Sequence, residues 1–243
     1  MLYIVPTPVG NMGDMTPRAV EVLRNCETIY AEDTRTSSVL MKRFDILTPL
    51  KSFHKFNEHN ALTEVTDRLK GGADIALISD AGTPGISDPG FLLSRECRRC
   101  GIDVVTLPGA TAFVPALVSS GLPCERFVFQ GFLPVKKGRA TRMAEIASSE
   151  MTSIVYESPL RLARTLAQLA EVCGADREAS VSREISKLHE DTMRGTLGEL
   201  TEYYSQNNPR GEIVIIIGPK PQESRAMSHR NKYRFNSDEV EEE

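Results

Sequence analysis

The sequence predicts an α/β protein of two α/β domains, the first with a parallel sheet and the second with a mixed sheet. Short β-rich runs alternate with helical patterns over residues 2–107, which is typical of a parallel sheet covered by helices. The breaker Gly121-Leu122-Pro123 then precedes a second series of runs, and a polar segment without apolar periodicity ends the chain. We therefore expect domains at 1–119 and 120–220 and a mobile polar, acidic tail at 221–243.

In the first series, five runs are expected to be strands. They are Leu2–Pro6, Thr28–Ala31, Leu50–Phe53, Asp74–Ser79 and Asp103–Leu107. Helices are clearest at Pro17–Asn25 and Ala61–Lys70. Thr16 gives the first helix an N-cap followed by proline, and Gly71 and Gly72 close the second.

The second series also contains five expected strands but fewer clear helices. The strands are Arg126–Phe132, Ser153–Tyr156, Ala179–Arg183, Asp191–Gly195 and Glu212–Ile217. Leu160–Cys173 is the main helical pattern. We expect Asp191–Gly195 to pair antiparallel with a neighbour, which makes this sheet mixed.

Composition excludes several classes of protein. A formal charge of -4 is unlike a protein that coats nucleic acid through bulk electrostatics, so any RNA contact is expected to be local. The N-terminus does not read as a signal peptide, and the longest apolar run, Ile213–Ile217, is far below the roughly 20 residues of a membrane span. We expect a soluble, cytoplasmic protein that binds neither membrane nor DNA.

The five cysteines indicate a reducing compartment. They are odd in number and lie in segments with a core pattern, so we interpret them as thiols. Cys97 and Cys100 form a C-x-x-C, but no second ligand pair accompanies it and the motif falls late in a helical pattern. We interpret this pair as two small side chains one helical turn apart.

Three loops that follow predicted strands carry the residues expected to bind a ligand. They are Pro6–Asn11, Ser79–Gly90 and Leu107–Ala112. Open α/β sheets bind ligands at the carboxyl ends of their strands, and the second loop holds three glycines, two prolines and two aspartates. The first loop is equally consistent with a structural turn, and Gly109 in the third with a helix entry. Neither a G-x-G-x-x-G nor a Walker-type lysine occurs, and no metal-ligand cluster is apparent, so we expect a polar ligand other than a triphosphate.

In this order, these loops resemble the tetrapyrrole-methylase superfamily, and most closely its bacterial members that methylate a cytidine 2′-hydroxyl in 16S ribosomal RNA. The strings that carry the resemblance are Leu2–Asn11, Ala31–Arg35, Ser79–Pro84, Leu107–Gly109, Gly131–Pro134, Tyr156–Ser158 and Gly211–Glu212. Glu32-Asp33-Thr34-Arg35 and Ser79–Pro84 separate the RNA enzymes from their corrin-methylating relatives. Longer members carry a small helical region after the second domain, where this chain has only the polar tail. This difference puts in doubt how the chain binds RNA.

The resemblance implies two α/β domains with a cleft between them that binds S-adenosylmethionine. The residues implied to bind this cofactor are Pro8, Asp80, Gly82, Thr83, Gly109, Thr111, Ala112, Tyr156, Arg183 and Gly211. It also implies a homodimer, and ribosomal RNA or the small ribosomal subunit as partner.

Catalysis of methyl transfer to a hydroxyl requires in-line positioning and benefits from a nearby proton acceptor. Glu32 and Asp33 are the candidates for that acceptor, and Arg35 for a phosphate anchor. The alternative is that these three side chains form only a local ion-pair network at a strand end.

Two further clusters are candidates for contact with RNA. His54, Asn57 and Glu58 follow the third strand, where the alternative is a solvated helix start. Lys136, Lys137 and Arg139 belong to the only dense basic stretch, where the alternative is simple solubility. For the whole chain, the competing functions are carbon methylation of a tetrapyrrole and a non-catalytic RNA- or nucleotide-binding module.

Overall fold

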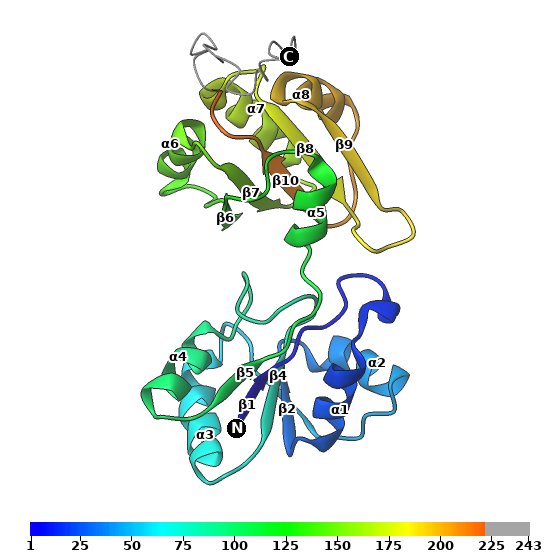
Figure 1. Ribbon diagram of the computed structural model, residues 1–243, viewed down its shortest axis with the longest axis vertical. Coiled ribbons are helices and arrows are strands. Elements are labelled where there is room, and N and C mark those ends of the chain that lie inside the picture. The colour runs from blue at the N-terminus through cyan, green and yellow to red at the C-terminus, as the bar shows by residue number, and fades with distance from the viewer. Residues whose placement is uncertain (222–243) are drawn as a thin grey trace, which may run out of the picture.

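A computed structural model describes residues 1–221 as two lobes stacked along the long axis of the molecule (Figure 1). The chain passes from one lobe to the other between β5 (Val104–Thr106) and α5 (Phe113–Ser120). Apart from its first residue, the predicted tail at 221–243 lies outside the described residues. Among the helices of residues 1–221, none is long and apolar enough to cross a membrane.

The first lobe contains a five-stranded parallel sheet in the order β3-β2-β4-β1-β5. Besides β5, its strands are β1 (Leu2–Ile4), β2 (Thr28–Ala31), β3 (Leu50–Ser52) and β4 (Ile75–Ile78). The residues of β2 and β4 are all buried because helices cover both faces of the sheet. The predicted parallel sheet is confirmed. β2 has its predicted bounds, and the other four strands are one or two residues shorter than the sequence runs.

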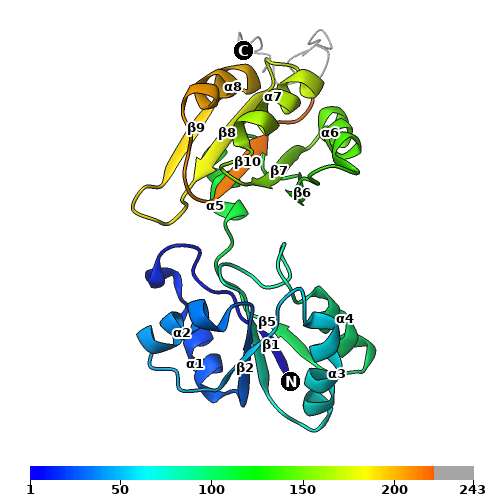
Figure 2. The ribbon, with the colours of Figure 1, turned by 180° about the vertical axis from the view of Figure 1, so that it is seen from behind.

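Two helices cover each face of this sheet (Figure 1 and Figure 2). The short 3₁₀ helix η1 (Met12–Asp14), α1 (Pro17–Asn25) and α2 (Thr34–Arg43) belong to one side, and α3 (Glu58–Lys70) and α4 (Phe91–Arg99) to the other. α1 has its predicted bounds, and Thr16 Oγ1 accepts from the Ala19 N–H at 3.1 Å. α3 begins three residues before the predicted start, at Glu58.

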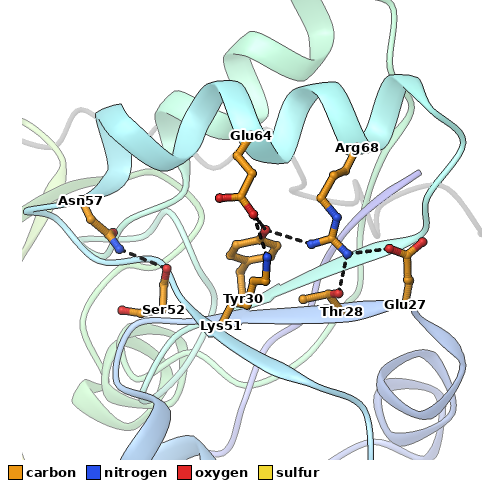
Figure 3. Close-up of polar contacts among 8 residues, drawn as sticks. All are labelled: Glu27, Thr28, Tyr30, Lys51, Ser52, Asn57, Glu64 and Arg68. Atoms are coloured by element: carbon orange, nitrogen blue, oxygen red, sulfur yellow. Dashed lines mark hydrogen bonds and ion pairs between the residues drawn. The ribbon is translucent and has the colours of Figure 1, made fainter.

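A polar network ties α3 to the sheet (Figure 3). The Arg68 guanidinium donates to Glu27 at 2.5 Å and to the Tyr30 hydroxyl at 3.0 Å. The Glu64 carboxylate accepts from that hydroxyl at 3.2 Å and from Lys51 at 2.7 Å. These contacts fix the face that α3 turns toward β2 and β3.

The second lobe contains a mixed five-stranded sheet in the order β6-β7-β10-β8-β9. Its strands are β6 (Phe127–Phe132), β7 (Thr152–Glu157), β8 (Glu178–Arg183), β9 (Asp191–Thr196) and β10 (Ile213–Ile217). Only β6 and β7 are parallel, and β9 pairs antiparallel with β8 as predicted. α6 (Arg139–Ser148), α7 (Leu162–Cys173) and α8 (Leu197–Gln206) contribute to the core on one face.

Of these three helices, only α7 was expected. α8 has a capping box at its start, in which Thr196 and Glu199 each bind the other's backbone N–H. The sequence Thr-x-x-Glu before an apolar residue is a recognisable signal for such a start, and it was missed. α6 begins at Arg139, one of the basic residues that the sequence made candidates for contact with RNA.

The other face of the second sheet is covered by α5. Ala116 and Leu117 of this helix belong to one apolar cluster with Ile154, Val214 and Ile216 of the strands. The predicted boundary at 119/120 assigns α5 to the first domain, whereas the helix packs on the second sheet. The division into domains stays a prediction about folding units.

All five cysteines are free thiols, as interpreted from the sequence. Cys97 is buried near the end of α4, and burial raises the pKa of its thiol to about 11. Cys100 follows it at the C-cap of the same helix. The pair fits its interpretation as small side chains one turn apart.

Candidate active site

The three predicted loops meet at the carboxyl edge of the first sheet and are bonded to one another. Thr7 and Gly82 exchange two backbone hydrogen bonds of 2.9 Å, which join the first loop to the second. The Thr83 hydroxyl donates to the carbonyl of Ala110 at 3.0 Å, which joins the second loop to the third. The loops therefore form one connected surface.

Two glycines permit this arrangement. Gly109 lies against Pro6 so closely that an added Cβ would stand 2.7 Å from the proline Cβ. Gly82 has a φ of +82°, which favours glycine. Gly109 was expected to bind the cofactor, but it is absent from the cleft wall and instead brings the first and third loops together.

A cleft with a volume of about 460 Å³ lies between these loops and the second sheet. Both lobes line it, through Val9, Glu32, Asp80–Thr83, Ile86–Asp88, Thr111 and Ala112 from the first and Phe132, Tyr156–Pro159, Ile185 and Gly211–Val214 from the second. The volume lies within the range of about 300–1,000 Å³ that is usual for small-molecule sites.

Most of the residues expected to bind a cofactor line this cleft. They are Asp80, Gly82, Thr83, Thr111, Ala112, Tyr156 and Gly211. Pro8 belongs to the first loop but does not form part of the wall. Arg183 is placed elsewhere: it lines a separate pocket with Tyr203 and Arg210, and its Nε lies 3.5 Å from a carboxylate oxygen of Asp191. We therefore withdraw Arg183 from the cofactor contacts.

Carboxyl groups gather at this cleft and raise one another's pKa values. Burial and the charge of Asp80 raise the pKa of Glu32, and burial and the charge of Asp33 raise that of Asp80. Burial and the charge of Glu32 raise the pKa of Asp88 to about 7. Such a cluster gives the cleft a negative potential, which favours a cationic ligand.

The pKa of the Asp33 carboxyl is instead lowered. It accepts from the backbone N–H of Arg35 at 2.8 Å and from its guanidinium at 2.6 and 3.1 Å, which lowers the pKa of Asp33 to about 2. So weak a base is a poor proton acceptor, so the ion-pair alternative describes Asp33 better than the catalytic one. Its N–H donates to Asp80 Oδ1 at 3.1 Å, and the Arg35 side chain is 89% exposed.

The residues after β3 are bonded within the chain. His54 Nδ1 accepts from the N–H of Asn57 at 3.2 Å, and the Asn57 amide donates to the carbonyl of Ser52 at 3.1 Å (Figure 3 draws the latter). Glu58 is buried and accepts from the N–H of Gly90 at 3.2 Å. We correct the expectation for Glu58, because its carboxylate braces the second loop instead of facing RNA.

The residues of the basic stretch also differ in exposure and in their hydrogen bonds. Lys136 and Lys137 are exposed, whereas Arg139 is only 8% exposed. The Arg139 guanidinium donates to Gln168 at 3.0 Å, to the carbonyl of Pro134 at 3.2 Å and to the Thr165 hydroxyl at 2.7 Å. Burial lowers the pKa of Arg139. We correct this expectation too, because the guanidinium is used inside the lobe.

Sequence reasoning missed three carboxylates of the cleft wall. Asp88 stands in the second loop, Glu157 ends β7, and Glu212 directly precedes β10. All three occur in strings that were noted for other residues, and their place in those strings was the only available signal. Among residues 1–221, no group of three or more His, Cys, Asp or Glu side chains is arranged to hold a metal ion.

Comparison with known proteins identifies the family to which this chain belongs. The tetrapyrrole (corrin/porphyrin) methylase family matches residues 1–201. The chain belongs to this family. Ribosomal RNA small subunit methyltransferase I of Synechocystis sp. is 46% identical, over 95% of this chain and 84% of its own. The protein of the same name from Thermotoga maritima is 41% identical, over 90% of this chain and 98% of its own.

Solved structures of methylases share the fold at low sequence identity. The methyltransferase CobJ has a TM-score of 0.68 at 18% identity, over 90% of this chain and 93% of its own. A cobalt precorrin-4 methyltransferase has a TM-score of 0.65 at 16% identity, over 89% and 94%. The tetrapyrrole methylase fold, with its parallel and mixed sheets, is thus confirmed for this chain.

Proposed function

We propose that this chain transfers a methyl group from S-adenosylmethionine to the ribose 2′-hydroxyl of a cytidine in 16S ribosomal RNA. Relatives that are 41–46% identical over about nine-tenths of the chain or more are named ribosomal RNA small subunit methyltransferase I, which supports an rRNA methyltransferase of the small subunit. The observation that carries the proposal is the carboxyl-rich cleft between the two sheets, which has the size and charge for a cationic methyl donor.

The residues of the cleft fit S-adenosylmethionine, which supplies an electrophilic methyl on a positively charged sulfur. Asp80 would accept hydrogen bonds from its amino group or ribose hydroxyls. Gly82 and Ala112 leave the backbone open to close approach, and Thr111 offers a hydroxyl. Tyr156 and Gly211 would hold the cofactor from the second lobe.

The chain's part in the reaction is to hold the acceptor in line and to remove its proton. Glu32 lies in the cleft wall, and burial and the charge of Asp80 raise its pKa, whereas the pKa of Asp33 is lowered, so Glu32 is the better proton acceptor of the two. Exposed cations would bind the RNA backbone: Arg35, Lys136 and Lys137 are the proposed phosphate contacts. His54 and Asn57 would border the RNA at the end of β3.

We also propose a cytoplasmic homodimer. A ribosomal substrate requires the compartment in which ribosomes assemble, and the thiol state of the cysteines accords with it. Exposed Phe127 and Val118 give the second lobe apolar surface that a second copy would cover. Light scattering on the purified protein would show a mass of two chains, and a single-chain mass would overturn the dimer.

The proposed reaction is tested with methyl-labelled S-adenosylmethionine and small ribosomal subunits that lack their modifications. Digestion of the RNA and mass spectrometry of the nucleosides should find the label in 2′-O-methylcytidine. Label in another nucleoside would overturn the cytidine, and its absence while calorimetry detects bound cofactor would overturn the acceptor. A parallel incubation with a tetrapyrrole then tests carbon methylation.

A further inference from the structure

A second pocket, with a volume of about 540 Å³, lies in the second lobe and outside the cleft. Its walls come from the end of β8, the β8–β9 loop, the second half of α8 and the segment that leads from α8 to β10. The β8–β9 loop reaches toward the first lobe (Figure 1 and Figure 2). Arg183, which the family resemblance assigned to the cofactor, is part of this pocket.

The pocket and the cleft share two stretches of backbone. Glu184 lines the pocket, and the next residue, Ile185, lines the cleft. In the same way Arg210 lines the pocket, and Gly211 lines the cleft. Consecutive Cα atoms are only about 3.8 Å apart, so a single layer of backbone separates the two sites. A polymer with one unit in the cleft therefore has to pass only this edge to place another unit in the pocket.

Hydrogen bonds from both lobes hold the edge between the two sites. Glu184 and Ser186 have φ values of +51° and +65°, which cost energy for any residue but glycine. The Glu184 carboxylate accepts from the N–H of Glu212 at 3.1 Å and from the Lys187 ammonium at 2.9 Å. The Ser186 hydroxyl donates to Asp14 of the first lobe at 2.7 Å. The wall of the pocket is thus fixed relative to the cleft.

Tyr204 brings a buried polar group to the pocket. This residue of α8 is only 3% exposed, belongs to the apolar core of the second lobe and lines the pocket. Its hydroxyl forms no hydrogen bond with any residue from 1 to 221, and burial raises its pKa to about 12. A buried hydroxyl without a partner costs free energy. Its place in the pocket wall therefore points to an occupant that supplies the missing hydrogen bond.

Tyr203, the preceding residue, gives the pocket an exposed aromatic ring. It is 44% exposed, and its ring meets that of Tyr204 at 90° with the centroids 5.0 Å apart. Contact with a buried ring limits the orientations that the exposed ring adopts. An oriented, accessible aromatic ring is the surface on which proteins stack the unpaired bases of single-stranded RNA.

Arginine and amide side chains complete the wall. Arg210 is exposed and forms no ion pair in the part of the chain that the structure describes. The shortest distance from Arg183 to Asp191 is 3.5 Å, between Nε and a carboxylate oxygen, which is longer than a usual hydrogen bond. Asn208 adds an amide that both donates and accepts. Guanidinium groups bind phosphate oxygens and amides bind base edges, so this wall suits a nucleotide.

On the basis of the proposed function, we propose that this pocket binds an unpaired nucleotide of the ribosomal RNA that flanks the methylated one. Its base stacks on Tyr203, and the base edge forms hydrogen bonds with the Tyr204 hydroxyl and the Asn208 amide. Arg210 binds its phosphate. The cleft thus holds the cofactor and the acceptor, whereas the pocket selects the RNA around the acceptor.

The test is the Kd of the whole chain for small ribosomal subunits that lack their modifications, measured by cosedimentation. Tyr203→Ala should raise this Kd by about 5- to 150-fold, because a base–aromatic stack is lost. Tyr203→Phe keeps the ring and should stay within about twofold of the wild type. Calorimetry should find the affinity of both variants for S-adenosylmethionine unchanged, since the pocket lies outside the cleft.

The phosphate contact is tested by the dependence of the same Kd on salt. Arg210→Ala should lower the slope of log K against log salt by about 0.7. Arg126→Ala is the matched control for charge, because this exposed residue precedes β6, at the end of the strand opposite to Phe132 in the cleft wall. It should leave the slope unchanged, and equal slopes for the two variants would remove Arg210 from the contact.

Ultraviolet crosslinking of the wild-type protein to the subunits locates the contact directly. Trypsin releases residues 195–210 as one peptide that contains Tyr203 and Tyr204, and this peptide should carry a nucleotide. A crosslinked complex without a nucleotide on this peptide would overturn the proposal even if a variant failed to fold. An unchanged Kd for Tyr203→Ala would also overturn it, as would a loss for Tyr203→Phe as large as that for Tyr203→Ala.

The same experiments separate the pocket from the reaction. If the subunits crosslink to the peptide 195–210 but acquire no methyl label, the proposed reaction fails and the pocket remains an RNA site. If the subunits are labelled while Tyr203→Ala binds them as the wild type does, the reaction stands and the pocket loses its role.

Discussion

At the scale of single residues, carboxyl groups at one sheet edge have pKa values that are shifted in opposite directions. Asp33 is paired with Arg35, which holds its pKa at about 2, whereas burial among other carboxyl groups raises the pKa of Asp88 to about 7. The sequence shows two Asp residues in polar loops and nothing of this difference. Partner and burial, which depend on the fold, decide which carboxyl can exchange a proton near neutrality.

The raised pKa of Asp88 predicts that its charge weakens the fold. The pKa of Asp88 in the folded state, about 7, exceeds the ordinary aspartate value of 3.8, so the free energy of unfolding falls as pH rises between these values. Asp88→Asn should therefore be more stable than the wild type at pH 8 and gain little at pH 4. Since one pKa unit is worth about 1.4 kcal/mol, the gain has an upper limit of about 4 kcal/mol.

Urea unfolding between pH 4 and 8 measures this difference, and a difference that does not vary with pH would contradict it. Asp33→Asn is the matched control with the opposite sign. Because the pKa of Asp33 is lowered in the folded state, its carboxylate stabilises the fold above about pH 4 and loses this effect as pH falls toward 2. That variant should thus be less stable than the wild type at neutral pH.

We expect Asp80 to bind the cofactor and not to accept the proton of the substrate. Asp80→Ala removes a carboxylate that lines the cleft, and a hydrogen bond to a charged group is worth about 1.5–3 kcal/mol. The Kd for S-adenosylmethionine should rise by about 10- to 150-fold in calorimetry. Asp67→Ala, on the exposed side of α3, is the control, and equal affinity of both variants would remove Asp80 from the site.

At the scale of elements, the start of α6 is held by a buried chain of polar groups. Arg139 of α6 donates to Thr165 of α7, and Thr165 donates to Glu157 at the end of β7 at 2.7 Å. The hydroxyl thus links a buried cation to a buried anion. Because Glu157 belongs to the cleft wall, this chain connects the core of the second lobe to the site.

This connection predicts a marked loss of stability from a small change. Thr165→Val keeps the shape of the side chain but leaves Arg139 and Glu157 without their shared hydroxyl, which should cost about 1–3 kcal/mol. Arg139→Ala removes the guanidinium that donates to Gln168, Pro134 and Thr165, while Glu157 keeps its ion pair with Arg161, and should cost about 1–3 kcal/mol. Exposed Lys137→Ala should change stability by less than about 0.5 kcal/mol in the same urea titration. Equal stability of all three variants would contradict the network.

The elements themselves were largely predictable, and the exceptions share a cause. Alternation of β-rich and helical runs gave both sheets, and Thr16 with Pro17 gave the start of α1. Arg139 was misassigned because a basic residue beside two lysines has the pattern of an exposed surface. Its burial depends on Thr165 and Glu157, which lie 26 and 18 positions away, and only the folded lobe brings them together.

At the scale of the whole molecule, a cleft shared by two lobes explains which residues of its wall could be predicted from the sequence. Loops that follow parallel strands converge by topology, so strand order predicted the three loops, and the family resemblance named Asp80, Gly82 and Thr111 within them. The second-lobe wall depends on how the mixed sheet faces the first. Tyr156 was expected through family resemblance and lines the cleft, Arg183 lies in a separate pocket, and Glu212 lines the cleft without having been predicted.

On the proposed function, a net charge of -4 and an acidic cleft leave a few local cations as the contacts for RNA. Removing Lys136 and Lys137 together should weaken RNA binding and lower the slope of log K against log salt by about 0.7 for each lost phosphate contact to single-stranded RNA. Filter binding at several salt concentrations measures this slope. Lys70→Ala, at the far end of α3, is the control for charge alone. Because Arg139 is bonded inside the lobe, a double variant with an unchanged slope would leave the basic stretch without any role in RNA binding and move the contact to Arg35 and the residues after β3.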